Sequence, residues 1–414
     1  AHDNAVAIGN SAAARFSGTV NPANIGINSA IAVGGNAVAV GSNTVAIGTT
    51  SRAGTGFTIN TPNSPVNAGS NITVVGGRAE ANQNNATAIG ANSEISAENG
   101  TALGTNTVVS QAGGVAIGLG AQAIGPSTTA ATFASTAIGF NALAQDNGVA
   151  LGQNATARFS GTVTPANIGI NAASALGSNA VAVGSNTVAI GSTARAGTGF
   201  TFNTPNSEVF AGSNATAVGG RAEVNALGGT AIGANSEVSG DLGTALGVST
   251  QVTATSAIAI GAGRQATANG AITIGSGTTE AAAANAVAIG TDAVASGGSA
   301  VAIGLGQTAT GNGAVAIGDP NTAVGTGAVA IGADNTATGD GAVAVGNLTV
   351  ANGNGAVAIG NGAQANAAGA IALGDGAIAN DPNTVSFGAP GTTRRLTNVT
   401  DGVAANDAAT VGQL

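Results

Sequence analysis

Ala328-Val329-Ala330-Ile331-Gly332 is one copy of a five-residue phrase, A-V-A-I-G, that returns at nearly every fourteenth position along this chain. The glycines that close the phrase in the C-terminal half are Gly247, Gly261, Gly275, Gly290, Gly304, Gly318, Gly332, Gly346, Gly360, Gly374 and Gly388. Nine of the ten intervals between these glycines are fourteen positions, and the remaining interval is fifteen. Such regularity is typical of a solenoid, in which each repeat contacts its neighbours, and it predicts a stack of similar coils.

The repeat unit divides into two halves. Glycines spaced by seven positions occur in two clusters, at Gly34, Gly41 and Gly48 and at Gly177, Gly184 and Gly191. Within the phrase, Val and Ile alternate with Ala, which is the period of a β-strand, and Gly tolerates the positive φ of a sharp corner. We therefore expect each coil to hold two short strands, each closed by a tight turn.

Both faces of such a strand are apolar. In the phrase at residues 328–331, Val329 and Ile331 point one way, and Ala328 and Ala330 point the other way. A half-exposed strand would alternate apolar with polar residues, so we expect neither face to meet water. One coil encloses one face against its own opposite strand. The second face then needs another copy of the chain, which predicts a homo-oligomer.

Composition narrows the class of protein. The 414 residues include 69 Gly, 2% aromatic residues and no Cys, Met, Trp or Tyr, which suits a thin interior filled by small side chains. Nine Arg, no Lys and 18 acidic residues give a net charge of −9. That balance argues against nucleic acid as a partner, because phosphate binding needs a basic stripe. There is no apolar run of the ~18 residues that a membrane span needs and no signal-peptide pattern, so we expect an interior fragment of a longer protein.

A second, longer repetition is superimposed on the short one. The segment from Arg15 to Thr107 realigns without a gap with the segment from Arg158 to Thr250, and the offset from Arg15 to Arg158 is kept throughout. We call these two segments the cassettes. The expected parts are a β-roll head with inserts over residues 1–150 (first cassette 15–107), a duplicated cassette over 151–250 (cassette 158–250), a regular 14-residue-repeat β-roll over 251–392, and a neck with the start of a stalk over 393–414.

Each cassette interrupts the short rhythm twice, at residues 15–30 and 52–72 and again at 158–173 and 195–215. Loops that hang from a repetitive scaffold are where solenoids usually place recognition. The candidate binding residues in these inserts are Arg15, Phe16, Arg52, Phe57, Arg158, Phe159, Arg195, Phe200, Phe202 and Phe210. The alternative is that the Phe side chains, together with Pro22, Pro62, Pro165 and Pro205, fold the inserts down onto the coils or onto a neighbouring chain.

The C-terminal segment 393–414, TRRLTNVTDGVAANDAATVGQL, abandons the phrase. Paired Arg394 and Arg395 precede Asp401 and Asp407, and such groups form charge-assisted bonds between strands or chains, so we expect them to act as a clamp. Asn406 or Asp407 is expected to cap a helix that begins at Ala408.

The A-V-A-I-G ladder over most of residues 1–392, followed by RRLTNVTDG and AATVGQL, resembles the YadA-like head and neck of trimeric autotransporter adhesins, the surface fibres of Gram-negative bacteria. The resemblance implies an all-β, left-handed parallel β-roll of three identical chains, followed by a neck that leads to a coiled-coil stalk. It also implies attachment to host cells, extracellular matrix or other surfaces from the bacterial cell surface, with the outer-membrane anchor in a C-terminal domain not present here. The collagen-associated phrase of that family is N-S-V-A-I-G, whereas this chain usually has Ala before Val, as in Ala286-Val287 and Ala314-Val315.

Catalysis has little support in the sequence. A left-handed β-helix of hexapeptide repeats is a common acyltransferase scaffold with a His base, but half-units of seven do not match six, and the single His is His2. Without Cys and with one His, neither a transition-metal cluster nor a Ser-His-Asp triad is present. We therefore expect a non-enzymatic protein without a cofactor or a metal.

Two non-catalytic alternatives stay open beside adhesion. One is a structural spacer segment of a surface fibre. The other is an ice-binding solenoid, which requires a flat face with Thr in vertical register. We expect the threonines in question to lie at corners among Asn, Ala and Gly; they are Thr310, Thr322, Thr336 and Thr338.

Overall fold

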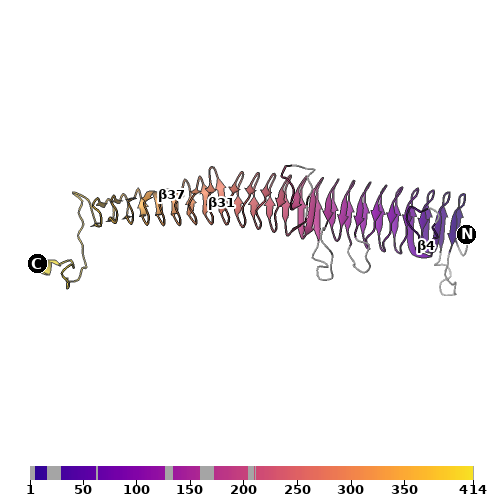
Figure 1. Ribbon diagram of the computed structural model, residues 1–414, viewed down its shortest axis with the longest axis horizontal. Coiled ribbons are helices and arrows are strands. Elements are labelled where there is room, and N and C mark those ends of the chain that lie inside the picture. Colours follow the sequence, from indigo (N-terminus) through magenta and orange to yellow (C-terminus); the bar gives the residue numbers. More distant parts are fainter. Residues whose placement is uncertain are drawn as a thin grey trace. The chain divides into compact units, whose positions relative to one another are not determined.

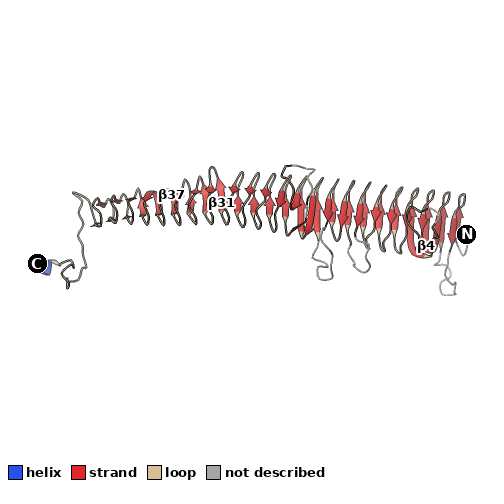
Figure 2. Ribbon diagram, viewed as in Figure 1, coloured by secondary structure: helices blue, strands red, loops and turns tan. Residues whose placement is uncertain are grey.

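The computed structural model describes residues 5–15, 29–61, 64–125, 134–158, 172–203, 209 and 211–413. The chain divides into two compact units, Ala1–Gly263 and Arg264–Leu414. Each unit is a stack of coils in which short strands follow one another in the same order (Figures 1 and 2). The expected all-β parallel solenoid is therefore confirmed.

In the first unit each regular coil contributes one strand to each of two parallel sheets. The first sheet holds β1 (Val6–Ile8), β3 (Ala30–Val33), the second half of β4 (Val38–Ile47), β6 (Gly69–Val75), β8 (Thr87–Ile89), β10 (Thr101–Leu103), β12 (Val115–Ile117), β14 (Thr136–Ile138), β16 (Val149–Leu151), β18 (Ala173–Leu176), β20 (Thr187–Ile190), β23 (Thr216–Val218), β25 (Thr230–Ile232), β27 (Thr244–Leu246) and β29 (Ile258–Ile260). The second sheet holds β2 (Ala13–Arg15), the first half of β4, β5 (Arg52–Ala53), β7 (Glu80–Ala81), β9 (Glu94–Ile95), β11 (Val108–Val109), β13 (Gln122–Ile124), β15 (Leu143–Gln145), β17 (Thr156–Arg158), β19 (Val181–Ser185), β21 (Arg195–Gly197), β24 (Glu223–Asn225), β26 (Glu237–Val238) and β28 (Gln251–Val252). The short β22 (Gly212–Ser213) pairs with the end of β19.

The second unit repeats this arrangement. Its first sheet holds β31 (Ile272–Ser276), β33 (Val287–Thr291), β35 (Val301–Gly304), the first halves of β37 (Val315–Val324) and β38 (Val329–Thr338), β39 (Val343–Asn347), β41 (Val357–Ile359), β43 (Ile371–Leu373) and β45 (Val385–Ser386). Its second sheet holds β30 (Gln265–Ala266), β32 (Glu280–Ala281), β34 (Val294–Ala295), β36 (Thr308–Thr310), the second halves of β37 and β38, β40 (Val350–Asn352), β42 (Gln364–Ala365) and β44 (Ile378–Ala379).

The strand register confirms the fourteen-residue period. Thr101 of β10 pairs with Thr87 of β8 on one side and with Val115 of β12 on the other, so both partners lie one full period away. Among the ten intervals from Gly247 to Gly388, the one of fifteen positions lies between β31 and β33, where Ile272 pairs with Val287. Parallel pairing through the same register carries the backbone hydrogen bonds from each coil to the next.

Alanine makes up most of the interior of the coils, and in the second unit the cluster of buried hydrophobic residues is alanine throughout. Ala328 and Ala330 have no exposed surface, whereas Ile331 on the other side of β38 is 37% exposed and Val329 is half-buried. The structure thus shows which of the two apolar faces is enclosed. Because the two sheets are close together, small side chains fill most of the space between them. Larger enclosed hydrophobic side chains occur in the first unit, and they include Ile72, Val74, Ile95, Val109, Val224, Val238 and Val252.

Glycine is required at the corner that follows each first-sheet strand. Gly90 has φ of +135°, and a Cβ on it would lie 2.2 Å from the carbonyl oxygen of Gly104 in the next coil. Gly104 in turn faces Gly118 in the same way, at 2.7 Å. Backbone therefore stacks directly on backbone at this corner, and no side chain fits.

Asparagine lines the opposite corner in the first cassette. Asn71, Asn85 and Asn99 have φ of 55° to 57°, a left-handed conformation that Asn adopts more readily than most residues. The side-chain amide of Asn71 donates to Asn85 at 3.1 Å, and Asn85 donates to Asn99 at the same distance. This ladder joins successive coils outside the backbone pairing.

A buried polar column interrupts the alanine interior of the second unit. Its members occupy the same place in four successive coils and are Gln307, Asn321, Asn335 and Thr349. The amide of Asn321 donates to Gln307 at 3.1 Å, and Asn335 donates to Asn321 at 2.8 Å. Thr349 in turn hydrogen bonds to Asn335 through both its backbone and its hydroxyl. Each buried amide is thereby paired with groups of its own and the neighbouring coil, as burial of polar atoms demands.

The threonines expected at corners lie on strands instead, so that expectation was wrong. Thr310 ends β36, Thr322 belongs to β37, and Thr336 and Thr338 belong to β38. The reason is that the corner ends one residue earlier than expected, at a residue whose side chain points into the coil. These residues are Gln307, Asn321 and Asn335. The following threonine then starts the second-sheet strand and points outward.

Helical structure in the described part of the chain is limited to the 3₁₀ turn η1 (Val411–Gln413). Accordingly, none of the helices described is long and apolar enough to span a bilayer.

The glycine corner gives a test of the stacking. We expect Gly90→Ala to lower the free energy of unfolding by at least about 2 kcal/mol, because the new methyl group meets a carbonyl oxygen at a φ that Ala rarely adopts. Gly220→Ala is the matched control, since no atom lies within 4 Å of its Cβ position, and its effect should stay within about 0.5 kcal/mol. Denaturant titration of both variants measures the difference, and equal losses would show that the corner is not close-packed.

Candidate binding surface

The insert of the first cassette leaves the second sheet after β5 and returns before β6. Thr55 and Asn67 form an antiparallel bridge, with N–O distances of 3.0 Å and 2.7 Å, that brings the two ends of the insert together. The described part of the insert, residues 54–61 and 64–68, therefore forms a closed loop beside the second sheet.

Arg52 holds this loop down. The residue is 3% exposed, and its guanidinium donates to the backbone oxygens of Thr61, at 2.8 Å, and Ser64, at 2.6 Å. It also pairs with Glu80 at 3.4 Å and stacks on the ring of Phe57, with 4.2 Å between Cζ and the ring centroid. Charge-assisted hydrogen bonds and a cation–π contact thus converge on one buried side chain.

Two further residues complete the latch. The second carboxylate oxygen of Glu80 accepts the backbone N–H of Asn60 at 2.6 Å. The side-chain amide of Asn82 accepts from the N–H of Phe57 at 3.1 Å and donates to its carbonyl oxygen. Because Arg52 and Phe57 are used in this way, their side chains fix the insert to the coil and do not face solvent.

The second cassette repeats the latch at the equivalent positions. Arg195 pairs with Glu223 at 3.5 Å and stacks on Phe200 at 4.1 Å. Glu223 accepts the backbone N–H of Asn203 at 2.8 Å, and Asn225 donates to the carbonyl oxygen of Phe200 at 2.6 Å. Arg195 and Phe200 are buried like their counterparts.

Burial shifts the pKa values of both members of the ion pair in this second latch. It raises the pKa of the Glu223 carboxyl, although hydrogen bonds from Asn203 and the charge of Arg195 act in the opposite direction. Burial likewise lowers the pKa of the Arg195 guanidinium, opposed by Glu223. Desolvation therefore exceeds the attraction within the pair, as is common for buried ion pairs.

The other candidate insert residues have different surroundings. Arg15 is exposed, and Arg158 is half-buried with its guanidinium 3.3 Å from the carbonyl oxygen of Val209. Phe202 is half-buried and lies edge-on to Phe200, with ring centroids 5.5 Å apart. Phe16, Phe159 and Phe210 lie outside the described residues.

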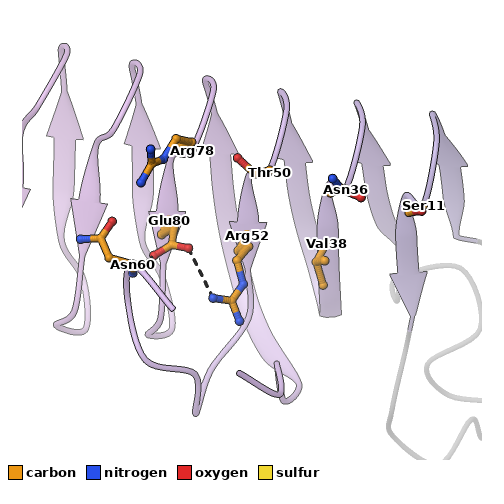
Figure 3. Close-up of a pocket in the computed structure, with 8 residues that line it drawn as sticks. All are labelled: Ser11, Asn36, Val38, Thr50, Arg52, Asn60, Arg78 and Glu80. Carbon is orange, nitrogen blue, oxygen red and sulfur yellow. Dashed lines mark hydrogen bonds and ion pairs between the residues drawn. The ribbon is translucent and has the colours of Figure 1, made fainter. Parts of the chain in front are cut away.

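A pocket of about 600 Å³ opens beside the first latch (Figure 3). Its lining residues are Ser11, Asn36, Val38, Thr50, Arg52, Asn60, Arg78 and Glu80. Figure 3 shows Ser11, Asn36, Thr50 and Arg78 on successive corners, above Val38, Arg52 and Glu80 on the second sheet. Of these eight residues, the sequence indicated only Arg52. The corner residues occupy equivalent places in successive coils, so a repeat-by-repeat alignment is the signal that would have grouped them.

In the C-terminal segment, the arginines and the aspartates have separate partners. Arg394 donates to the backbone oxygens of Phe387, at 2.5 Å, and Asp375. Asp401 accepts the hydroxyl of Thr410 at 2.5 Å, and Arg395 is exposed. The two ion pairs found among the described residues are those of the latches, so an arginine–aspartate clamp within one chain is not present there.

Asp407 binds backbone groups that precede it in the chain. Its carboxylate accepts the N–H groups of Val403 and Ala404, each at 2.9 Å, and these bonds lower its pKa. A helix cap at this residue would instead accept from N–H groups that follow it. The expected helix from Ala408 is therefore replaced by the short turn η1, which begins at Val411.

Comparisons with known proteins bear on this surface and its scaffold. Among solved structures, the collagen-binding domain of the Yersinia adhesin YadA is similar, with 30% sequence identity over 39% of this chain and 82% of that chain, and a TM-score of 0.26. There is no significant match among curated proteins.

A family model for the YadA head domain repeat matches the segments 28–51, 73–93, 96–121, 171–194, 211–236, 239–263, 281–306, 309–335, 323–349, 337–363, 351–377 and 365–389. These segments fall on the coils in both units and cover more than half of the chain. The coils that carry both latches thus have a recognised family pattern, and the chain belongs to the YadA head domain repeat family.

Proposed function

We propose that this chain is the projecting head of a homotrimeric adhesin on a bacterial surface, and that it attaches without catalysis. The observation that carries the proposal is the row of large apolar side chains on the outer side of the first sheet. In the first unit it includes Ile89 and Ile232, 41% and 42% exposed, and in the second unit Ile331 and Ile359. Contiguous apolar rows of this kind mark interaction surfaces.

Three identical chains that face one another through their first sheets would remove these rows from water. Burial of a fully exposed Val or Ile contributes about 1.5–3 kcal/mol. These side chains are already partly buried in the single chain, so association adds a fraction of that value at each coil. Identical chains fit because a ladder of one period is complementary in spacing to its own copies. In this arrangement the coils are left-handed, residues 393–414 form the neck that leads to a stalk, and the fibre is anchored in the outer membrane.

The second sheet would then face outward with the inserts. The chain would have four parts, with boundaries at residues 150, 250 and 392. The two cassettes would present the insert loops, and the regular segment 251–392 would make the head longer. Contacts repeated on three chains give avidity without high affinity at any one site. The bound surface is of the host cell, matrix or abiotic class, with Arg15, Arg158 and Phe202 as the insert residues that keep exposed or half-exposed side chains.

Collagen is not specifically favoured as the ligand. The residue before Val in the phrase, such as Ala286 or Ala314, is completely buried between the sheets. Thr44 takes this place in one coil, and its hydroxyl lies 3.3 Å from the carbonyl oxygen of Gly41, inside the coil. A hydroxyl at this position is therefore used internally and is not presented to a ligand.

Ice binding is a second candidate because Thr308, Thr322 and Thr336 pair in register on the second sheet. The run is short, since Val294 and Val350 occupy the next places on either side. Adhesion therefore ranks first. Thermal hysteresis discriminates between them: we expect no freezing-point gap at micromolar protein, and a clear gap would favour ice binding. The spacer function is tested by the attachment assay below.

The trimer is tested by two substitutions in one strand. Ile331→Asp should leave the coil folded and weaken association, because its side chain points outward and places a carboxylate in the interface. Ala330→Asp should instead unfold the coil, because it places a carboxylate between the sheets. Sedimentation measures the mass and circular dichroism the strand content. A wild-type chain that sediments as a folded monomer would refute the trimer.

Attachment is tested by shortening the inserts. We replace residues 56–66, residues 199–209, or both with two glycines, which keeps the coils of each cassette. The double variant should retain its mass and melting temperature while attachment to cells, matrix proteins or plastic falls at least tenfold. Unchanged attachment to all three would assign the inserts to structure, and absence of attachment by the wild type would favour a spacer.

A further inference from the structure

The pocket of the first cassette contains one cation without a partner. The guanidinium of Arg78 is exposed and makes no hydrogen bond or ion pair with any described residue. Arg52 and Glu80 are also in the lining, but their charges are paired with each other in the latch. The lining residues therefore carry one net positive charge, in a chain whose net charge is −9.

Uncharged polar groups surround this cation. The side-chain amide of Asn36 makes no hydrogen bond to a described residue. The amide nitrogen of Asn60 donates to Glu94 at 2.7 Å, and its amide oxygen accepts no hydrogen bond from the described residues. The hydroxyl of Thr50 donates to the backbone oxygen of Thr49 and keeps its acceptor capacity. Val38 supplies an apolar side chain on the second sheet, below Asn36 and beside Arg52 (Figure 3).

We propose that this pocket binds a saccharide that carries a carboxylate. A guanidinium binds a carboxylate through two parallel hydrogen bonds, which is the geometry that Arg78 offers. Amides and hydroxyls on the adjacent corners match the hydroxyl groups of a sugar ring, and the methyl groups of Val38 match its C–H face. The volume lies in the range of small-molecule sites.

Other classes of ligand fit less well. The lining has no aromatic ring on which a nucleobase would stack. A single unpaired arginine does not neutralise a polyphosphate, and the acidic chain repels a long polyanion. A metal cation would have to displace the latch, because both oxygens of Glu80 are engaged by Arg52 and Asn60.

The second cassette contains the same groups in a closed arrangement. In the alignment of the two cassettes, Arg78 and Asn60 correspond to Arg221 and Asn203. There the guanidinium donates to the side-chain oxygen of Asn203 at 2.8 Å. A ligand would have to break this bond before it could bind, so the second pocket is expected to bind more weakly and serves as an internal control.

The pocket lies on the second sheet and its corner, opposite the apolar rows, so it stays open in the proposed trimer. This inference deepens the proposed adhesive function by naming a ligand class. Its chemistry is nevertheless contained in one chain, since all eight lining residues come from residues 11–80. Binding of a monosaccharide therefore does not depend on the oligomeric state, whereas avidity for a surface does.

The test measures binding of glucuronic acid to the immobilised full chain by surface plasmon resonance. Its methyl ester, glucose and inorganic sulfate are the comparison probes. Arg78→Asn is the main variant because Asn favours the left-handed backbone of residue 78, with φ of 58°, and so preserves the corner. Arg221→Asn is the matched control in the second cassette. Sedimentation of each sample reports the oligomeric state separately.

We expect glucuronic acid to bind at least tenfold more tightly than its ester or glucose. Arg78→Asn should weaken this binding at least tenfold, and Arg221→Asn should change it less than twofold. Equal binding of the acid and the ester, equal effects of the two variants, or equal binding of sulfate would each overturn the proposal. Binding of the acid by a chain that sediments as a monomer would support this site while refuting the trimer.

Discussion

The narrow space between the two sheets determines most of this structure. Most of the enclosed hydrophobic side chains are alanines, such as Ala328 and Ala330, although the first unit also encloses larger ones such as Ile95. The stabilisation that a single coil gains from its interior is therefore small, and the larger Val and Ile of the same strand must lie outside. A chain built on this plan folds its least apolar surface inward and leaves its most apolar surface for a neighbour. The proposed association of identical chains thus follows from the narrow space between the two sheets.

Corners carry the remaining constraints and give the coil its surface chemistry. At one corner Gly90 stacks on Gly104 without room for a side chain, and at the other Asn71 and Asn85 join coils through their amides. Residues just after the glycine corner project outward on every coil, which is how Thr50 and Arg78 line one pocket. The residues available for binding therefore lie at these corners and in the inserts, because the strands are used for pairing between coils.

Sequence alone predicted the features that follow from local spacing. The fourteen-residue period, its two halves and the apolar character of both strand faces follow from the glycines and the alternation of Val with Ala. Which face is enclosed was not predictable, because Ala and Val are both apolar. Of the residues of the first latch, only Phe57 was foreseen in this role, as an alternative to binding, and the role of Arg52 was not foreseen. The pocket was not foreseen, because Ser11, Asn36 and Arg78 become neighbours through a register that skips the inserts. Asp407 was misjudged since its carboxylate binds N–H groups that precede it.

The duplicated latch shows why such a chain diversifies by copying. Each coil contacts only its neighbours, so a cassette that moves as a block keeps Arg52, Glu80 and Phe57, or Arg195, Glu223 and Phe200, in the same relation. The two cassettes then differ at positions whose side chains do not hold the insert to the coil. Ile59 in the first insert corresponds to Phe202 in the second. Arg78, which has no partner among the described residues, corresponds to Arg221, which binds Asn203. A solenoid therefore conserves the anchor of an inserted loop and leaves its recognition groups free to change.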